Sequence, residues 1–322
     1  MVLPDRRLRL AFFGTPEIAK TVLDGLIEAG TDDIALVISQ PDRPKGRGKK
    51  LEPTPVKALA EQNGLLVEQP RKLRDGALAE RLRALEIDLA IVVAYGRILP
   101  VDVFEAPHHD TWNVHASLLP HLRGASPIQH AILEGHEETG VTLMRLSEGM
   151  DEGDMLLKKS LRISANDTSG RLTERLAKLG ATAAIEGIAL AKTSGLTVEP
   201  QPHDEATYAG MLEKKDGQLD FTNSAAAIDR RVRAFDPWPG TFVLNKQGQP
   251  IKIRRVSKVD TQPRSDVKPG CIVSIDPLWV QTGDNIIAIE EIQPPGKRAM
   301  SSSDFIRGAG RSLKAGDDLS NC

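Results

Sequence analysis

Residues 8–16 read LRLAFFGTP, and this stretch and the segment up to residue 38 decide the fold of the first half of the chain. The apolar run at its start is typical of a buried strand. Thr15 and Pro16 are residue types that cap and begin helices, and the segment 17–29 has helical apolar spacing. The run IALVI at 34–38 predicts a second strand. A strand, a helix and a strand in this order form a βαβ unit, which opens a parallel α/β sheet.

The same alternation continues through the first half. Further strands are predicted at 89–94, 111–115, 141–146 and 155–163, and helical spacing lies at 55–63, 75–85, 127–133 and 166–193. We therefore predict that residues 1–194 form a mostly parallel, doubly wound, Rossmann-like domain of the α/β class. The turn after the first strand lacks Gly-x-Gly-x-x-Gly, which argues against a dinucleotide cofactor.

The pattern changes in the second half. Residues 195–208 contain Pro200 and Pro202 with few large apolar side chains, so we predict a linker there. A helix is expected at 225–235, and short strand-like runs follow at 240–244, 250–259, 270–275, 278–282 and 285–292. Five short strands separated by turn residues predict that residues 209–322 contain a small OB-like β-barrel, a fold that often binds nucleic acid.

The net charge of the 322 residues is −2, which indicates no partner that is a polyanion as a whole. The halves differ, because residues 1–208 hold 25 basic and 30 acidic side chains, whereas residues 209–322 hold 17 and 14. A mildly basic second half fits contact with nucleic acid, and ordinary surface charge explains it equally well. The side chains that would form a basic face on the barrel, or a merely solvated surface, are Lys252, Arg254, Arg255, Lys258, Lys297 and Arg298.

Two cysteines, Cys271 and Cys322, are too few for a disulfide framework, and no Cys-His cluster has the spacing of a zinc site. The N-terminus lacks the apolar segment of a secretory signal, and no apolar run approaches the length of a membrane span. We expect a cytoplasmic protein without membrane association.

The segment 40–50, QPDRPKGRGKK, is a basic loop with two prolines and two glycines. It is not a phosphate-binding Walker loop, because its spacing differs and no Ser or Thr follows the final lysines. Its five basic side chains form either a solvated flexible loop or a mobile arm that binds a phosphate backbone beside the active site. These side chains are Arg43, Lys45, Arg47, Lys49 and Lys50.

Chemistry is concentrated between residues 113 and 154. If Asn113 and His115 lie on a strand, their side chains share one face and Val114 takes the other. The amide of Asn113 suits hydrogen bonding to a developing oxyanion, and the imidazole can move a proton near neutral pH. Asp151, in a glycine-flanked loop, is placed to orient that imidazole. Taken singly, each residue also has an ordinary structural reading as a turn, half-buried or capping residue.

The chain resembles the folate-dependent formyltransferase family nearly end to end. In the first half the resemblance rests on FFGTP at 12–16, QPDRPxGRGKK at 40–50, VAYG at 93–96, NVHxSLLP at 113–120, RGAxPIQ at 123–129, ETGVT at 138–142 and DxGD at 151–154. In the second half it rests on RAFxPWP at 233–239 and GKxAM at 296–300. The basic loop and the second half narrow the resemblance to the methionyl-tRNA formyltransferases.

The resemblance implies transfer of the formyl group of 10-formyltetrahydrofolate, a co-substrate, to the amino group of initiator methionyl-tRNA for translation initiation. In that reaction Asn113 and His115 would stabilise the oxyanion. Asp151 would pair with His115 and help to move the amine proton. No covalent intermediate on the protein is needed, because the amine attacks the formyl carbon directly.

The resemblance also implies where the substrates lie. The folate would contact Ala94, Tyr95, Ser117, Leu118, Leu119 and Pro120. The basic loop, through Arg43, Lys45, Arg47, Lys49 and Lys50, would bind the acceptor stem, with Arg47 the most prominent. The barrel would hold the rest of the tRNA. The family further suggests a monomer that uses no metal.

Two other functions remain open from the sequence. One is a related folate-dependent formyltransferase that acts on an amino sugar nucleotide and needs no basic loop. The other is a non-catalytic RNA-binding protein with a decayed transferase domain, which the presence of Asn113, His115 and Asp151 argues against.

Overall fold

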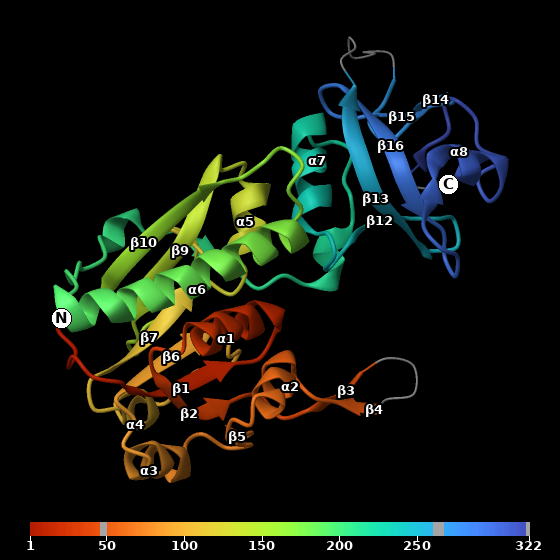
Figure 1. The fold of residues 1–322 in the computed structure, drawn as a ribbon. Coiled ribbons are helices and arrows are strands. Elements are labelled where there is room, and N and C mark those ends of the chain that lie inside the picture. Colours follow the sequence, from red (N-terminus) through yellow and green to blue (C-terminus); the bar gives the residue numbers. More distant parts are fainter. Residues whose placement is uncertain (46–49, 260–266, 320–322) are drawn as a thin grey trace. The chain divides into compact units, whose positions relative to one another are not determined.

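The computed structural model describes residues 1–45, 50–259 and 267–319, and the described residues form two compact units (Figure 1). The first unit comprises Met1–Pro127, Glu138–Arg162 and Thr173–Ala209. The second comprises Ile128–Glu137, Ile163–Leu172 and the described residues from Gly210 onward.

The first unit is built on a seven-stranded, mostly parallel sheet. Its strand order is β10 (Met155–Arg162), β9 (Glu138–Arg145), β7 (Asp110–His115), β6 (Leu89–Val93), β1 (Arg9–Gly14), β2 (Asp33–Ile38) and β5 (Val67–Glu68). The strands from β7 to β5 pair in parallel, whereas β9 is antiparallel to both β7 and β10. Because β1, β6 and β7 are parallel, their carboxyl ends lie at one edge of the sheet. The strand order reverses on the two sides of β1. Ligands of open α/β sheets bind at such an edge.

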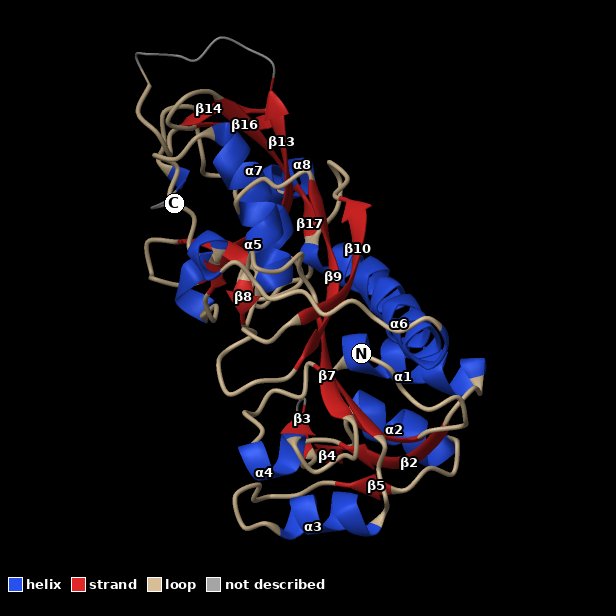
Figure 2. Cartoon of the chain, turned by 90° about the vertical axis from the view of Figure 1, so that its left-hand side faces the viewer, coloured by secondary structure: helices blue, strands red, loops and turns tan. Residues whose placement is uncertain are grey.

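Helices cover both faces of this sheet (Figures 1 and 2). On one face, α1 (Glu17–Ala29) packs against α6 (Ser169–Thr193), where Gly25 lies against Ala181 and Gly180 lies against Val114 of β7. On the other face, α3 (Ala77–Ala84) and α4 (Val101–Phe104) share an apolar core with the opposite sides of β1, β2 and β6. The predicted doubly wound α/β fold is confirmed. None of the helices in the described part of the chain is long and apolar enough to span a bilayer.

The sequence pattern predicted the positions of helices α1 and α2, but not how α1 is capped. Helix α1 ends at the predicted residue, but Pro16, expected as its first residue, is its N-cap, and no side chain caps it. Thr15 instead donates from Oγ1 to the carbonyl oxygen of Tyr95 at 3.0 Å, which joins the end of β1 to the end of β6. Helix α2 (Pro55–Gln62) carries a side-chain cap, because Thr54 Oγ1 accepts from the Lys57 backbone N–H.

The second unit is an antiparallel β-domain, as predicted. Its pairing path runs through β12 (Thr241–Leu244), β13 (Pro250–Val259), β16 (Ile286–Gln293), β15 (Leu278–Gln281) and β14 (Ile272–Ile275), with β17 (Met300–Ser301) on β16. Helices α7 (Ala225–Ala234) and α8 (Ser302–Arg307) belong to the same unit, and Ile228 and Phe305 enter its core. Closure of these strands into an OB-like barrel stays a prediction.

The boundary between the units is not a single cut in the chain. Residues 195–208 lie against the first unit, where Glu199 exchanges backbone hydrogen bonds with Met155 at the end of β10. Conversely, the second unit includes residues of helix α5 (Pro127–Leu133), because Arg230 of α7 donates to the Leu133 carbonyl oxygen at 3.1 Å. The composition of residues 195–208 is typical of a linker. It could not predict the hydrogen bonds that this segment makes with distant residues of the first unit.

A buried carboxylate fastens the N-terminal segment to the sheet. Asp88, whose side chain is 2% exposed, accepts from both terminal nitrogens of Arg6 and from the Arg9 backbone N–H at 2.7–2.8 Å. Burial acts to raise the pKa of Asp88, but the hydrogen bonds from Arg6 and Arg9, with the charge of Arg6, outweigh it and lower that pKa. The folded protein therefore stabilises the ionised carboxylate.

Replacing Asp88 with asparagine is expected to lower the free energy of unfolding at pH 7 by about 1–2 kcal/mol, since Arg6 is half exposed. Because the folded-state pKa is below the unfolded value of about 3.9, this stabilisation is complete above that value and is lost as the pH falls through the folded pKa. Urea unfolding at pH 7 and at about pH 3 measures the difference. Asp33→Asn removes an exposed pair with Arg7 and serves as the control. An Asp88→Asn effect that grows on acidification would contradict the assignment.

Candidate active site

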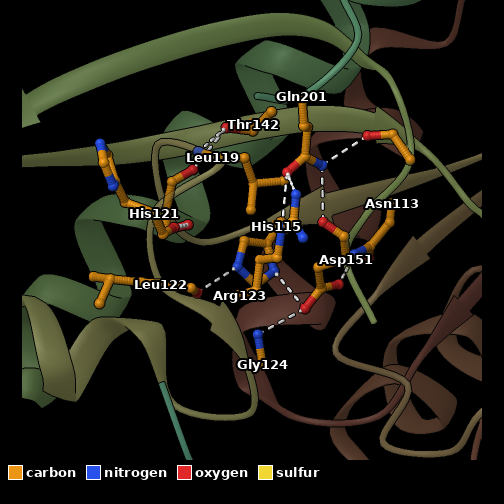
Figure 3. A network of polar contacts seen from close by, with 12 residues as sticks. Asn113, His115, Leu119, His121, Leu122, Arg123, Gly124, Thr142, Asp151 and Gln201 are labelled. Atoms are coloured by element: carbon orange, nitrogen blue, oxygen red, sulfur yellow. Dashed lines mark hydrogen bonds and ion pairs between the residues drawn. The ribbon is translucent and has the colours of Figure 1, made fainter. Parts of the chain in front are cut away.

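Asn113, His115 and Asp151 lie together at the carboxyl edge of the sheet (Figure 3). Asn113 and His115 project from β7 on the side opposite to Val114, as strand alternation predicts. Asp151 reaches them from the loop between β9 and β10. Its Oδ1 accepts from Asn113 Nδ2 at 3.3 Å, and its Oδ2 lies 3.5 Å from His115 Nδ1. Side chains that are 38 residues apart in sequence therefore share one carboxylate.

The surroundings of His115 determine which ring nitrogen carries hydrogen. Nε2 lies 3.0 Å from the Leu122 carbonyl oxygen, and a carbonyl oxygen only accepts, so Nε2 is the donor. In the neutral ring Nδ1 then has a lone pair, which faces the Asp151 carboxylate. The Nδ1 lone pair and the Asp151 carboxylate are both hydrogen-bond acceptors, so the space beside them favours a group that donates to both. An amine, or a proton taken up by Nδ1, satisfies that requirement.

Backbone groups complete the site, and they could not be predicted from the sequence. The Gly124 N–H donates to Asp151 Oδ2 at 2.9 Å, and the Leu122 carbonyl orients His115. Both flank Arg123 at the short strand β8 (Arg123–Gly124), which pairs with β11 (Tyr208–Ala209). Backbone donors and acceptors are present at every residue, so no residue type in the sequence marks them.

The loop that carries Asp151 has an unusual backbone. Asp151 has a φ of 54°, in the left-handed region of backbone conformation. Residues other than glycine, asparagine and aspartate rarely adopt this region. Two residues later, a Cβ on Gly153 would overlap the Arg145 carbonyl oxygen at the end of β9. Glycine at 153 lets the loop return closely along β9, and this close return brings Asp151 back over β7.

The residues expected to contact folate lie at the same edge, but several of their side chains are turned inward. Tyr95 is 2% exposed and packs edge to face on Phe13 in the core beneath the edge. Burial raises the pKa of its hydroxyl. Its carbonyl oxygen accepts from Thr15 and from Gln40 Nε2. Ala94 is exposed with φ of 43°, so it offers backbone as well as its methyl group.

The Ser117–Pro120 loop is held from below by β9. Thr142 Oγ1 donates to the Ser117 carbonyl oxygen at 2.8 Å and accepts from the Leu119 N–H at 3.0 Å. Leu119 packs with two buried methionines, and Pro120 is also buried, whereas Leu118 is half buried. The Ser117 hydroxyl donates to the His121 carbonyl oxygen at 2.6 Å. In this arrangement the loop has a fixed shape, and Leu118 is its more accessible side chain.

A pocket of about 440 Å³ opens at this edge. It is lined by residues that follow β1, β2 and β6 and by the hairpin beyond β2, among them Thr15, Gln40, Arg43, Glu52, Ala94 and Gly96. A volume of this size accommodates part of a folate or the end of an aminoacylated nucleotide.

The basic loop is a hairpin made by β3 (Arg43–Lys45) and β4 (Lys50–Glu52). Arg43 is exposed and donates to the Gln40 side-chain oxygen at 2.7 Å. Residues 45 and 50 are paired in the backbone register of the two strands. Arg47 and Lys49 lie outside the described residues.

A polar network fixes the base of this hairpin to α2. Asp42 accepts from Lys57 Nζ and from Gln69 Nε2, each at 2.7 Å, and Gln69 also donates to the Gln40 carbonyl oxygen. Burial acts to raise the pKa of Asp42, but the hydrogen bonds from Lys57 and Gln69 and the lysine charge lower it overall. The hydrogen bond to Asp42 raises the pKa of Lys57. The base of the hairpin is thus anchored by an ionised pair.

The basic side chains of the second unit differ in their surroundings. Arg254 lies 3.5 Å from Asp236, and Arg255 lies 2.6 Å from Glu290, so their charges are partly balanced. Lys252 and Lys258 are exposed on β13. Lys297 and Arg298 are exposed just before β17.

Comparison with known proteins identifies the family. A formyl transferase model matches residues 8–188, and a formyl transferase C-terminal domain model matches residues 211–310. The chain belongs to the formyl transferase family. It is 44% identical to methionyl-tRNA formyltransferase of Marinobacter nauticus over 314 residues, which cover 97% of this chain and 100% of that protein. It is 43% identical to methionyl-tRNA formyltransferase of Desulfotalea psychrophila over 307 residues, covering 95% and 94%. The resemblance predicted from sequence motifs is confirmed.

Solved structures of low sequence identity share the fold. HypX from Aquifex aeolicus, in complex with tetrahydrofolic acid, has a TM-score of 0.63 at 16% identity, covering 93% of this chain and 47% of that one. This chain therefore spans about half the length of HypX. An N-formyltransferase from Helicobacter canadensis, in complex with folinic acid and dTDP-3-aminofucose, has a TM-score of 0.65 at 20% identity, covering 88% and 99%.

Proposed function

We propose that this protein transfers the formyl group of 10-formyltetrahydrofolate to the amino group of initiator methionyl-tRNA, giving N-formylmethionyl-tRNA and tetrahydrofolate for translation initiation. The observation that carries the proposal is identity of 43–44% to two methionyl-tRNA formyltransferases over nearly the whole chain. The convergence of Asn113, His115 and Asp151 supplies the chemistry that this reaction needs.

In the proposed mechanism the methionyl amine attacks the formyl carbon beside His115. A new C–N bond forms, and the former carbonyl oxygen becomes an oxyanion. Asn113 has a second Nδ2 hydrogen besides the one directed at Asp151, and this hydrogen stabilises the oxyanion. The His115–Asp151 pair takes the amine proton, directly or through water. The bond from the formyl carbon to N10 of the folate then breaks, and N10 receives a proton.

We assign the folate to the edge formed by Ala94, Tyr95 and the Ser117–Pro120 loop. The inward side chains of Tyr95 and Leu119 mean that these residues act by shaping the edge, and contacts come from backbone groups and from Ala94 and Leu118. The pocket that Ala94 lines lies between this edge and the base of the basic hairpin, and Asn113, His115 and Asp151 are not among its lining residues.

We assign the acceptor stem to the hairpin that carries Arg43, Lys45, Arg47, Lys49 and Lys50, and the rest of the tRNA to the basic second unit. A negatively charged backbone is bound through such clusters of positive charge, so binding weakens as salt rises. The protein acts in the cytoplasm, where charged tRNA is made, and it acts as a monomer.

The alternative substrate is an amino sugar nucleotide. It is favoured only by the shared fold of the Helicobacter canadensis N-formyltransferase, at 20% identity. It leaves the anchored basic hairpin without a function.

A formylation assay with the full chain separates the two functions. The protein is incubated with 10-formyltetrahydrofolate and either methionylated initiator tRNA, uncharged tRNA or a dTDP-amino sugar. We expect product only with the charged tRNA. Neutralising Lys45, Arg47, Lys49 and Lys50 together is expected to raise the KM for tRNA at least about 10-fold, because several phosphate contacts are lost. Transfer to the amino sugar alone would overturn the proposal.

A further inference from the structure

Gln201 lies in the segment expected to be a linker, and in the structure it is 4% exposed and points toward the Asp151 loop (Figure 3). Its Nε2 donates to the carbonyl oxygens of Asp151 and Gly153, at 2.8 and 2.7 Å. Its Oε1 accepts from Nε and Nη2 of Arg123, at 3.0 and 2.8 Å. The amide thus uses both of its hydrogens and both acceptor positions. A buried side chain that is fully satisfied in this way is rigidly held.

Arg123 connects this amide to the carboxylate side of Asp151. It is 1% exposed, and its Nη1 lies 3.6 Å from Glu152, the residue after Asp151. Its chain neighbour Gly124 donates its N–H to Asp151 Oδ2. Gln201 therefore holds the backbone of the Asp151 loop, Arg123 supports Gln201 and lies beside the Glu152 carboxylate, and the Gly124 N–H holds the Asp151 side chain.

The backbone of Asp151 requires such support. Its left-handed conformation is one that aspartate adopts more readily than most residues, but it is still less favourable than the right-handed one, so contacts that hold it fix the shape of the loop. The two hydrogen bonds from Gln201 act on the carbonyls on either side of Glu152, so they fix the turn that aims the Asp151 carboxylate at Asn113 and His115.

We propose that Gln201, acting with Arg123, is a positioning residue for formyl transfer, which holds the Asp151 carboxylate against His115. Gln201 makes its contacts with the Asp151 backbone and does not reach the carboxylate itself. This assignment rests on the proposed function, because it concerns the same site.

A double-mutant cycle tests the proposal. Gln201→Met removes all four hydrogen bonds at similar volume and is expected to lower kcat for methionyl-tRNA formylation on the order of 10-fold, with both KM values within about twofold. In an Asp151→Asn background the same change is expected to alter kcat less than about twofold, because Gln201 then has no carboxylate to position. A purely structural role would lower activity equally in both backgrounds, and that result would overturn the proposal, as would an unchanged kcat.

Two further variants keep the test decisive. Thr111→Val removes another buried hydrogen bond of the first unit, from Thr111 Oγ1 to the Phe104 carbonyl oxygen at the far end of β7, and is expected to leave kcat unchanged. If Gln201→Met does not fold, Gln201→Glu keeps the shape and the acceptors for Arg123 but loses both donors, and the cycle is measured with it. If the wild-type protein formylates only an amino sugar, the proposed function fails, and the cycle is run with that amine instead.

Discussion

Replacing His115 with alanine is expected to lower kcat/KM for formyl transfer to methionyl-tRNA on the order of 100-fold or more. The imidazole is the group at the site that can accept and release a proton near neutral pH, and its Nε2–H is engaged with the Leu122 carbonyl. Nδ1 is therefore left to act beside Asp151. Alanine removes the proton acceptor that lies beside the Asp151 carboxylate.

Steady-state formylation with charged initiator tRNA measures this loss. His109→Ala is the matched control, because His109 also lies beside a carboxylate, 3.8 Å from Asp88, but at the opposite end of β7. Its rate is expected to equal that of the wild-type protein. Wild-type turnover by the His115→Ala variant would remove the histidine from the mechanism.

Asp151→Asn is expected to reduce kcat to a similar extent, about 100-fold or more, with little change in stability. Asparagine is tolerated in left-handed backbone, so the loop and its two hydrogen bonds from Gln201 are retained. What is lost is the negative charge beside His115, which stabilises the imidazolium formed when the amine proton is taken. The amide group also offers the Gly124 N–H and Asn113 Nδ2 only one acceptor oxygen in place of two.

Single-turnover rates at saturating substrate isolate this chemical effect from binding. Asp110→Asn is the control. Asp110 lies on the same strand, and its Oδ2 is 2.7 Å from Arg145 Nε in an ion pair outside the site. It is expected to retain kcat. If Asp151→Asn changes KM alone, the carboxylate serves binding and the proton-transfer role is wrong.

Much of the fold followed from local pattern. The helix Glu17–Ala29 was predicted from its apolar spacing, and Gly30 marked its C-terminal end, whereas its first residue is Glu17 and not Pro16. The five predicted strands of the second half correspond to β12–β16, since turn residues separate short apolar runs. Thr15 does not cap the helix, because Pro16 occupies the N-cap position and the Thr15 hydroxyl donates to the Tyr95 carbonyl and accepts from the Gln40 N–H.

Only part of the candidate active site could be predicted from local sequence pattern. Strand alternation placed Asn113 and His115 on one face, and the motif pointed to Asp151. Tyr95 was expected to contact the folate, and in the structure its ring packs on Phe13 in the core, which leaves its backbone at the edge. Gln201 carried no motif, and its importance depends on four hydrogen bonds to residues 48 to 78 positions away.

By itself, then, the sequence determined the succession of strands and helices, the family and the residue types available for chemistry, because periodicity, turn residues and motifs are properties of neighbours along the chain. Tertiary structure alone decided that a carboxylate 38 residues beyond Asn113 meets it, that the Leu122 carbonyl selects the protonated nitrogen of His115, and that a glutamine outside the catalytic motifs supports the loop between them. These are contacts between distant segments, and their energies depend on distance and direction in space, which no local pattern encodes.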